Sequence, residues 1–298
     1  MGTRGSLLAR AQTQHVVQQI QALYPEMEID VQIIQTTGDA RQNVPFAAVG
    51  TKGMFVKEIE QALLENTIDL GVHSLKDMPG ELPDGLALVC FPPREDPRDA
   101  LLCHIAADLE SLPQGAVVGT SSLRRKTQLL ALRPDLKIEE LRGNLDTRIR
   151  KLDSGEYDAI LLACAGLNRL GFGSRITHAI APEACCPAVG QGALALEART
   201  EDTALTTLLA PLNHTHTETA VCAERAFLLR LQGGCSIPAG AYAFFKGERL
   251  SVQAVLAAPN GTQILKTTQE GNPESAKALG IALAEDLLNR GGDLFLKG

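Results

Sequence analysis

The sequence contains no long hydrophobic run. Its longest stretch of apolar residues, glycine included, covers residues 159–167, nine in all, whereas a membrane-spanning helix needs about 20. The N-terminal segment carries arginines at positions 4 and 10 and no extended apolar stretch, unlike a secretory signal peptide. We therefore expect a cytoplasmic protein that does not associate with a membrane.

The seven cysteines lack the spacing of a metal site or a disulfide framework. They are odd in number, include no Cys-x-x-Cys pair and occur without an export signal, so we expect neither disulfides nor a bound metal. We interpret Cys164 and Cys222 as core residues. Cys235 differs because it lies in GGCSIP, where flanking glycines allow close approach and a thiol can be exposed enough to react. A structural role is the commoner one for such a cysteine.

Positive charge is scarce overall but concentrated in one segment. Lys and Arg number 28 against 35 Asp and Glu, a formal net charge of −7, which argues against a protein that coats nucleic acid or anionic membranes. Residues 120–151 nevertheless carry nine basic and four acidic residues, a net +5, which leaves −12 for the rest. They contain no Phe, Tyr or Trp to stack on bases, so a small polycarboxylate or phosphate fits them better than nucleic acid. The alternative is a solvated basic face.

Strand and helix patterns alternate along two stretches of the chain, which predicts α/β layering. The 298 residues are 45% hydrophobic and 21% charged, as in ordinary globular proteins. Asn272 and Pro273 predict the start of a final helix. In chain order, the predicted elements are helix 7–23, strand 29–33, helix 55–65, strands 68–72, 86–91 and 116–119, helix 123–132, strand 137–141, helix 144–154, strand 157–163, a helix ending at 231, strands 239–245, 249–257 and 262–268, and the final helix.

Proline and glycine cluster in two places that predict domain crossovers. These are residues 91–99 and 181–192, and such clusters interrupt regular structure. We predict three domains: residues 1–92 with 193–212, residues 98–187, and residues 215–298.

Two junctions in the basic segment predict anion binding. GTSSLRR (119–125) and LRGN (141–144) each place arginine where a strand meets the start of a helix. Backbone N–H groups and the helix dipole favour anions there, and a guanidinium can bind a carboxylate or phosphate through two parallel hydrogen bonds.

HSLKDMP (73–79) places Lys76 and Asp77 at the C-terminal end of a short apolar strand, where open α/β sheets bind ligands. An aspartate among cations stays ionised, and it can stabilise a developing positive charge or transfer a proton. The alternative is a turn residue that pairs with its neighbour.

Nine segments, in order along the whole chain, carry a more specific signal than any single motif. They are GTRGS (2–6), KGMFVKEIEQALLEN (52–66), HSLKDMP (73–79), REDPRDA (94–100), VGTSSLRR (118–125), LRGNLDTRIRKLD (141–153), AVGQGAL (188–194), AERAFL (223–228) and QGGCSIP (232–238). With them the sequence resembles the hydroxymethylbilane synthase family, also called porphobilinogen deaminase.

The resemblance implies a fold, an activity and a cofactor. The fold is α/β, with two domains resembling the lobes of type II periplasmic binding proteins, each with a mixed five-stranded sheet, and a small α+β C-terminal domain with a three-stranded antiparallel sheet. The activity is the head-to-tail condensation of four porphobilinogen molecules, with loss of ammonia, into the linear tetrapyrrole hydroxymethylbilane. The cofactor is a dipyrromethane primer joined by a thioether to Cys235. Asp77 is the catalytic residue, and it stabilises positively charged intermediates.

The resemblance also assigns residues to the acetate and propionate arms of cofactor and substrate. These are Arg4, Ser6, Gln12, Ser74, Lys76, Thr120, Ser121, Ser122, Arg124, Arg125, Arg142, Gly143, Asn144, Arg148 and Gln191. Each added pyrrole brings two carboxylates, and the +5 segment supplies the charge to accommodate them. The sequence departs from the family at its short N-terminus, at Asn43 in place of aspartate and at Ala48 in place of lysine.

Two other functions remain open. A non-catalytic, two-lobed anion-binding protein would bind carboxylates reversibly and leave Cys235 unmodified. A thiol-nucleophile hydrolase would need a histidine base, and only the fold could bring His73 to Cys235. For the favoured function we expect a monomer with porphobilinogen as substrate and no nucleic-acid partner.

Overall fold

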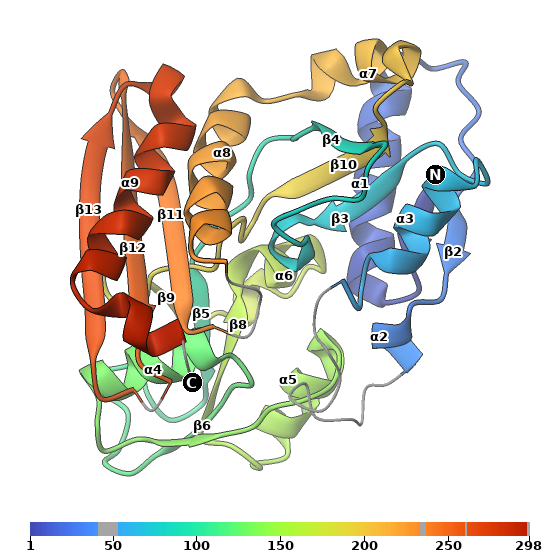
Figure 1. Ribbon diagram of the computed structural model, residues 1–298. Coiled ribbons are helices and arrows are strands. Elements are labelled where there is room, and N and C mark those ends of the chain that lie inside the picture. The colour runs from blue at the N-terminus through green and yellow to red at the C-terminus, as the bar shows by residue number, and fades with distance from the viewer. Residues whose placement is uncertain (41–52, 233–236, 260, 297–298) are drawn as a thin grey trace. The chain divides into compact units, whose positions relative to one another are not determined.

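The computed structural model describes residues 1–40, 53–232, 237–259 and 261–296 (Figure 1). The chain forms two compact units, one of Met1–Glu95 with Ala193–Glu218 and the other of Asp96–Gly192 with Thr219–Gly298. The chain therefore leaves the first unit inside the first proline-rich segment and returns directly after the second. The three domain boundaries given above stay a prediction.

The first unit contains a mixed five-stranded sheet in the order β2-β1-β3-β10-β4. β1 is parallel to β2 and β3, whereas β10 is antiparallel to both of its neighbours, β3 and β4. β10 follows the return of the chain from the second unit, so the two segments of this unit share one sheet. The strands are β1 (Gly2–Arg4), β2 (Gln32–Ile34), β3 (Gly71–Ser74), β4 (Leu86–Cys90) and β10 (Leu194–Arg199).

The longer helices of the first unit pack on this sheet through their apolar sides. Val16 and Ile20 join the strand residue Val72 in one core cluster, and Ile59 and Leu63 join a second cluster. The helices are α1 (Leu7–Leu23), α2 (Thr37–Ala40), α3 (Lys57–Leu64) and α7 (Thr203–Leu209), with 3₁₀ turns at Leu75–Asp77 and Ala210–Leu212.

The second unit contains another mixed five-stranded sheet, in the order β7-β6-β8-β5-β9. β5 is antiparallel to β8 and β9, and β6 is parallel to β7 and β8. Leu101 packs with Leu129 of α4, whereas its neighbour Leu102 packs with Ile149 of α5, as the alternation of side chains along a strand requires. The elements are β5 (Asp99–Cys103), β6 (Val117–Gly119), α4 (Leu123–Leu132), β7 (Lys137–Glu139), α5 (Leu145–Asp153), β8 (Ala159–Ala163), α6 (Cys164–Arg169), a 3₁₀ turn (Gly173–Arg175) and β9 (His178–Ile180).

A three-stranded antiparallel sheet completes the second unit. Phe227, Leu283 and Val252 are fully buried in one core cluster, which joins two helices to this sheet (Figure 1). The elements are α8 (Thr215–Arg230), which begins in the first unit, β11 (Ala239–Lys246), β12 (Arg249–Ala257), β13 (Ile264–Gly271), a 3₁₀ turn (Pro273–Ser275), α9 (Ala276–Asn289) and a 3₁₀ segment (Gly292–Leu296).

The predicted fold class is confirmed: two mixed five-stranded sheets and one antiparallel three-stranded sheet, with helices packed against them. Several predicted details were wrong. The strands β1, β5 and β9 and the helices α2, α6 and α7 were not predicted. β2 begins three residues later than expected, and Ile29 packs from a loop against a core cluster, partly buried. Asn272 caps the 3₁₀ turn before α9 rather than α9 itself. Cys222 is exposed, not buried. No helix among the described residues has the length and apolarity that crossing a membrane demands.

Candidate active site

A 3₁₀ turn presents Asp77 at the end of β3. Leu75 and Met78 are 1% and 2% exposed and anchor the turn on either side of it. The Leu75 N–H donates to the carbonyl of Ala193 at 3.0 Å, and the Met78 N–H donates to Leu75 at 3.1 Å. The side chain of Asp77 is 33% exposed. The turn therefore fixes the backbone while it leaves the carboxylate open to solvent.

Arg4 ends β1 and approaches this carboxylate. Its Nη1 lies 4.0 Å from Asp77 Oδ2, and its guanidinium lies 4.1 Å from the centroid of the Phe55 ring. Stacking on an aromatic ring holds a guanidinium in one place without neutralising it. A cation is thus kept beside Asp77 at a separation that leaves the carboxylate able to interact with a second cation.

Gln12 and Ser74 interact beside the same strand end. Gln12 is 4% exposed, and its Nε2 lies 2.8 Å from Ser74 Oγ, which lies 3.1 Å from Gln12 Oε1. Ser6 accepts a hydrogen bond from the Ala9 N–H at 3.3 Å and so caps α1. These predicted site residues, with Arg4, Lys76 and Asp77, all lie in the first unit.

In the second unit, the two predicted anion-binding junctions lie side by side. The Ser121 hydroxyl donates to the carbonyl of Leu141 at 2.5 Å, and the Thr120 N–H donates to the carbonyl of Glu139 at 2.9 Å. Ser122 caps α4 by accepting from the Arg125 N–H at 3.4 Å. The turn before α4 is therefore hydrogen-bonded to the segment that leads into α5.

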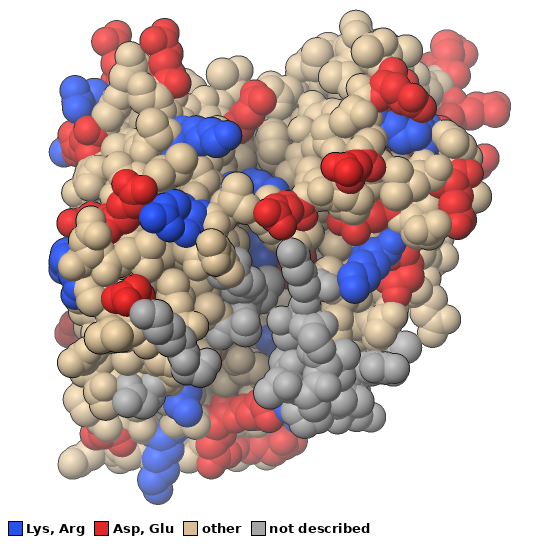
Figure 2. All heavy atoms as spheres, viewed as in Figure 1, with Lys and Arg blue, Asp and Glu red and all other residues tan. Residues whose placement is uncertain are grey.

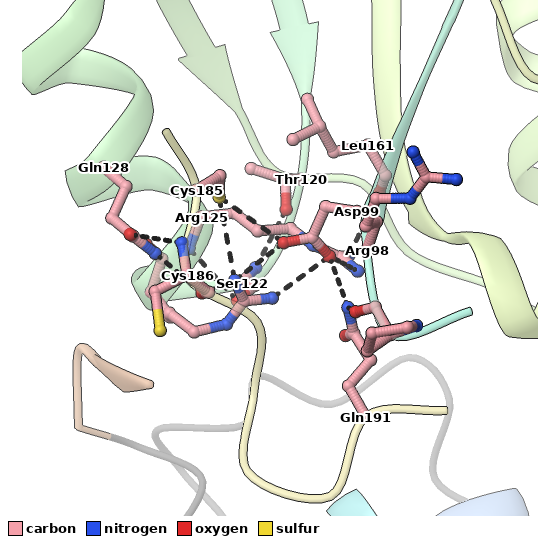
Figure 3. A network of polar contacts seen from close by, with 12 residues as sticks. Arg98, Asp99, Thr120, Ser122, Arg125, Gln128, Leu161, Cys185, Cys186 and Gln191 are labelled. Carbon is pink, nitrogen blue, oxygen red and sulfur yellow. Dashed lines mark hydrogen bonds and ion pairs between the residues drawn. The ribbon is translucent and has the colours of Figure 1, made fainter. Parts of the chain in front are cut away.

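A buried carboxylate that sequence reasoning missed, Asp99, binds the two arginines of the first junction. Arg124 Nη1 donates to Asp99 Oδ2 at 2.7 Å, and Arg125 donates to Oδ1 through Nη2 at 2.7 Å and through Nε at 2.9 Å. Figure 3 shows Asp99 with Arg125, Gln191 and Cys185 around it. Asp99 belongs to the quoted REDPRDA motif, but its role depends on a strand, β5, that was not predicted.

Burial and charge act in opposite directions on this cluster. Burial would raise the pKa of Asp99, but the charges and hydrogen bonds of Arg124 and Arg125 outweigh it and hold that pKa well below its usual range. Burial would likewise lower the pKa of Arg124, but Asp99 keeps it above its ordinary value. Asp99 and Arg124 therefore stay ionised. With the second guanidinium, that of Arg125, two cations face one anion and the cluster carries a net charge of +1.

Arg148 adds a second excess cation. Burial and the nearby charge of Arg125 lower the pKa of Arg148 to about 10. Its Nε donates to the carbonyl of Gly143 at 2.8 Å, and no carboxylate in the described ranges forms an ion pair with it. Arg142, in contrast, pairs with Glu140 at 2.6 Å. A bound carboxylate would relieve the repulsion between Arg125 and Arg148.

Part of the excess charge is buried rather than spread over a solvated face. Arg124 and Arg125 are only 5% and 6% exposed. On the face that Figure 2 shows, Lys and Arg are interspersed with Asp and Glu. Arg148 is half-buried, whereas Lys126 and Lys137 of the same segment are exposed. An anion interacts more strongly with the buried arginines than with a charge at an open surface.

The structure thus groups the predicted site residues unit by unit. Those of the second unit gather around the starts of α4 and α5 and around Asp99, to which Gln191 Nε2 donates at 2.9 Å. Asn144 precedes α5, and Gly143 has a φ of +109°, a conformation that favours glycine. Cys235, Asn43 and Ala48 lie outside the described residues.

Comparison with known proteins identifies two matching family profiles. Residues 1–207 match "Porphobilinogen deaminase, dipyromethane cofactor binding domain", and residues 218–289 match "Porphobilinogen deaminase, C-terminal domain". Together they cover nearly the whole chain.

The solved structures that match the chain are distant in sequence. A lipoprotein of Bacillus subtilis is 10% identical, with a TM-score of 0.44 over 72% of this chain and 89% of that one. A periplasmic substrate-binding protein of an ABC transporter from Coxiella burnetii is 16% identical, with a TM-score of 0.43 over 71% and 90%. A nutrient-binding protein from Burkholderia cenocepacia, bound to methionine, is 16% identical, with a TM-score of 0.41 over 70% and 88%.

Proposed function

The chain belongs to the porphobilinogen deaminase family, and we propose that its arginine cluster holds carboxylate arms while Asp77 supports the chemistry. The activity of the family is the condensation of four porphobilinogen molecules, head to tail and with release of ammonia, into hydroxymethylbilane. One observation carries the residue assignment: within the part of the chain that the structure describes, Asp99 is the single carboxylate that pairs with Arg124 and Arg125, and none pairs with Arg148.

The residues around α4 and α5 fit the dipyrromethane cofactor of the family. Each of its two pyrrole rings carries two carboxylates, and an excess of partly buried cations is what such a polyacid requires. When bound, the group supplies the primer to which pyrrole units are added. It would be attached through Cys235 and held by Thr120, Ser121, Ser122, Arg124, Arg125, Arg142, Gly143, Asn144, Arg148 and Gln191.

Asp77 acts on the reacting pyrrole. Loss of ammonia from porphobilinogen leaves a positively charged fragment, and an ionised carboxylate nearby lowers the energy of that cation. The carboxylate can also accept or return a proton during the same step. Because the 3₁₀ turn fixes its backbone, Asp77 needs little reorganisation when charge develops.

The residues near Asp77 bind the arms of the incoming substrate. Arg4 supplies a cation that stacks on Phe55 and is 4.0 Å from Asp77. Ser6, Gln12, Ser74 and Lys76 supply hydrogen-bond donors around the end of β3. We further propose that the protein acts as a cytoplasmic monomer, with no nucleic-acid or membrane partner.

Intact-mass measurement tests the proposal. Wild-type protein should be heavier than its sequence by two linked pyrrole units, and Cys235→Ser should have the mass of its sequence alone. Cys222→Ser is the matched control, because Cys222 is an exposed cysteine on α8, and it should keep the added mass. A bare thiol at position 235 in protein supplied with porphobilinogen would overturn the proposal and favour the non-catalytic anion-binding protein.

A further inference from the structure

We propose that Asp99 is a positioning residue for ligand binding: it fixes the guanidiniums of Arg124 and Arg125 in one orientation and leaves the pair with net positive charge. The inference rests on the proposed function, because it requires that these arginines bind carboxylate arms. It concerns a residue that no ligand needs to touch.

The carboxylate of Asp99 uses all of its capacity to accept hydrogen bonds within the protein. Oδ1 accepts from Arg125 Nε and Nη2 at 2.9 and 2.7 Å, from Arg124 Nη2 at 3.2 Å and from Gln191 Nε2 at 2.9 Å. Oδ2 accepts from Arg124 Nη1 at 2.7 Å and from the Cys185 thiol at 3.4 Å. A carboxylate has about four lone-pair sites, and Asp99 is 0% exposed. It therefore has no capacity left to bind substrate or transfer a proton.

The two arginines, in contrast, keep donors available. Asp99 engages Nε and Nη2 of Arg125, and the carbonyl of Leu161 engages Nη1 at 3.1 Å. A guanidinium has five N–H groups, so two of those on Arg125 have no acceptor within the described part of the chain. Their direction is set by the bonds to Asp99 and Leu161.

Arg124 is held still more firmly. Its Nη1 donates both to Asp99 and to the carbonyl of Cys186, at 2.6 Å. That carbonyl also accepts from Gln128 Nε2 at 3.1 Å. Both guanidiniums are therefore positioned from several sides before any ligand binds, which reduces the reorganisation that binding requires.

The positioning of two arginines that must still attract an anion requires one carboxylate rather than none or two. With none, two buried guanidiniums would repel each other and would have no common anchor. With two, the charge of the pair would be neutralised, and an incoming carboxylate would find no net attraction. Asp99 fixes the orientation of the two guanidiniums and still leaves the pair with a net positive charge.

Two substitutions separate positioning from charge. Asp99→Asn removes the negative charge but keeps the size of the side chain, whereas Asp99→Glu keeps the charge and moves it by one methylene. For each variant, intact mass gives the fraction of protein that carries the cofactor. Steady-state kinetics then give kcat per loaded site and KM for porphobilinogen.

A positioning role predicts a loss of turnover per loaded site. Displacement of the arms by about 1 Å can lower a rate by about 10²-fold, so we expect a loss of this order in both variants. In Asp99→Asn the pocket gains an uncompensated positive charge, so KM for the anionic substrate should fall while kcat falls. A merely structural role would lower the loaded fraction and leave kcat per loaded site and KM unchanged, and that result would overturn the inference.

Two controls complete the experiment. Asp135→Asn removes another Arg–Asp ion pair of the same unit, in which Asp135 lies 2.7 Å from Arg133. This variant should leave kcat and KM unchanged. If Asp99→Asn does not fold, as judged by circular dichroism, the kinetics of Asp99→Glu test the inference instead. Wild-type turnover of Asp99→Glu would overturn the inference. Arg125→Gln tests the proposed function itself. Full activity of Arg125→Gln would overturn both the proposed function and the positioning role of Asp99. If Arg125→Gln is inactive while both Asp99 variants are fully active, only the positioning role of Asp99 is overturned.

Discussion

Arg148 and Arg125 lie on different helices, α5 and α4, and yet burial and then the charge of Arg125 both lower the pKa of Arg148. Both guanidiniums are at least partly buried, and no carboxylate in the described ranges pairs with Arg148. Cations held together in this way favour any carboxylate that binds between or beside them. The relationship predicts that removal of one cation weakens binding without weakening the fold.

Arg148→Gln should therefore affect binding and stability differently. Loss of one charged hydrogen bond to a carboxylate arm of the cofactor amounts to about 1.5–3 kcal/mol, so kcat/KM for porphobilinogen should fall by about 10- to 100-fold. The free energy of unfolding, measured by urea denaturation of cofactor-free Cys235→Ser protein, should not decrease, because glutamine can still donate to Gly143. Arg150→Gln is the control, since Arg150 is 74% exposed on the same helix. A clear loss of stability in Arg148→Gln would contradict this account.

Asp77→Ala should fold normally and lose most of its turnover. The side chain is 33% exposed, so its removal leaves no buried cavity, while loss of a general acid–base group lowers kcat by about 10²- to 10⁴-fold. Steady-state formation of hydroxymethylbilane and thermal unfolding measure the two effects. Asp84→Asn, an exposed aspartate in the same unit, should retain activity. Near-normal turnover of Asp77→Ala would remove Asp77 from the mechanism.

Glu60→Gln should stabilise the protein in a pH-dependent way. Burial and the charge of Glu197 raise the pKa of Glu60, and His73, which lies 2.9 Å from Glu197, offsets only part of this. A carboxyl with a raised pKa binds its proton more tightly in the folded state, so its ionisation destabilises the fold above that pKa.

At pH 8 the expected result for Glu60→Gln is a gain in the free energy of unfolding, because glutamine occupies the same buried position without a charge. It should disappear as the pH falls below the unfolded value of 4.5, where both states are protonated. Urea unfolding at several pH values measures it. Glu65→Gln, on an exposed residue just after the same helix, should show no such dependence, and a gain for Glu60→Gln that persisted at low pH would argue against the cause given.

Gly240→Ala should destabilise the second unit by about 1–3 kcal/mol. A Cβ at this position would lie 2.5 Å from the Pro187 carbonyl oxygen and 3.0 Å from Arg124 Cδ. Backbone cannot move aside as a side-chain end can. Gly271→Ala, on β13 of the same sheet, meets only the Leu279 side chain, at 3.3 Å, and should change the free energy of unfolding less. Equal effects of the two substitutions would be inconsistent with this packing.

Elements with strong local signals could be predicted from the sequence. α4 has the predicted bounds, because Ser122 caps it and its apolar residues follow a helical period. β12 also has its predicted bounds. β5 could not be predicted, because five residues that follow Pro97 become a strand only by pairing with β8 and β9.

In the candidate site, too, local features could be predicted from the sequence and tertiary contacts could not. The position of Arg124 and Arg125 at a strand–helix junction was readable from GTSSLRR. Their ion pairs with Asp99 were not, because these join residues 25 and 26 positions apart through tertiary structure. The sequence predicts where charge accumulates, whereas only the fold determines how much of that charge is compensated.

The position of β10 between β3 and β4 has a consequence for biosynthesis. When residues 1–95 have left the ribosome, the strand that joins β3 to β4 has not yet been translated, and residues 96–192 must emerge first. The nascent N-terminal segment therefore carries two strand edges that cannot pair with each other. A truncated product that ends near residue 95 would expose these strand edges, and it should aggregate rather than fold.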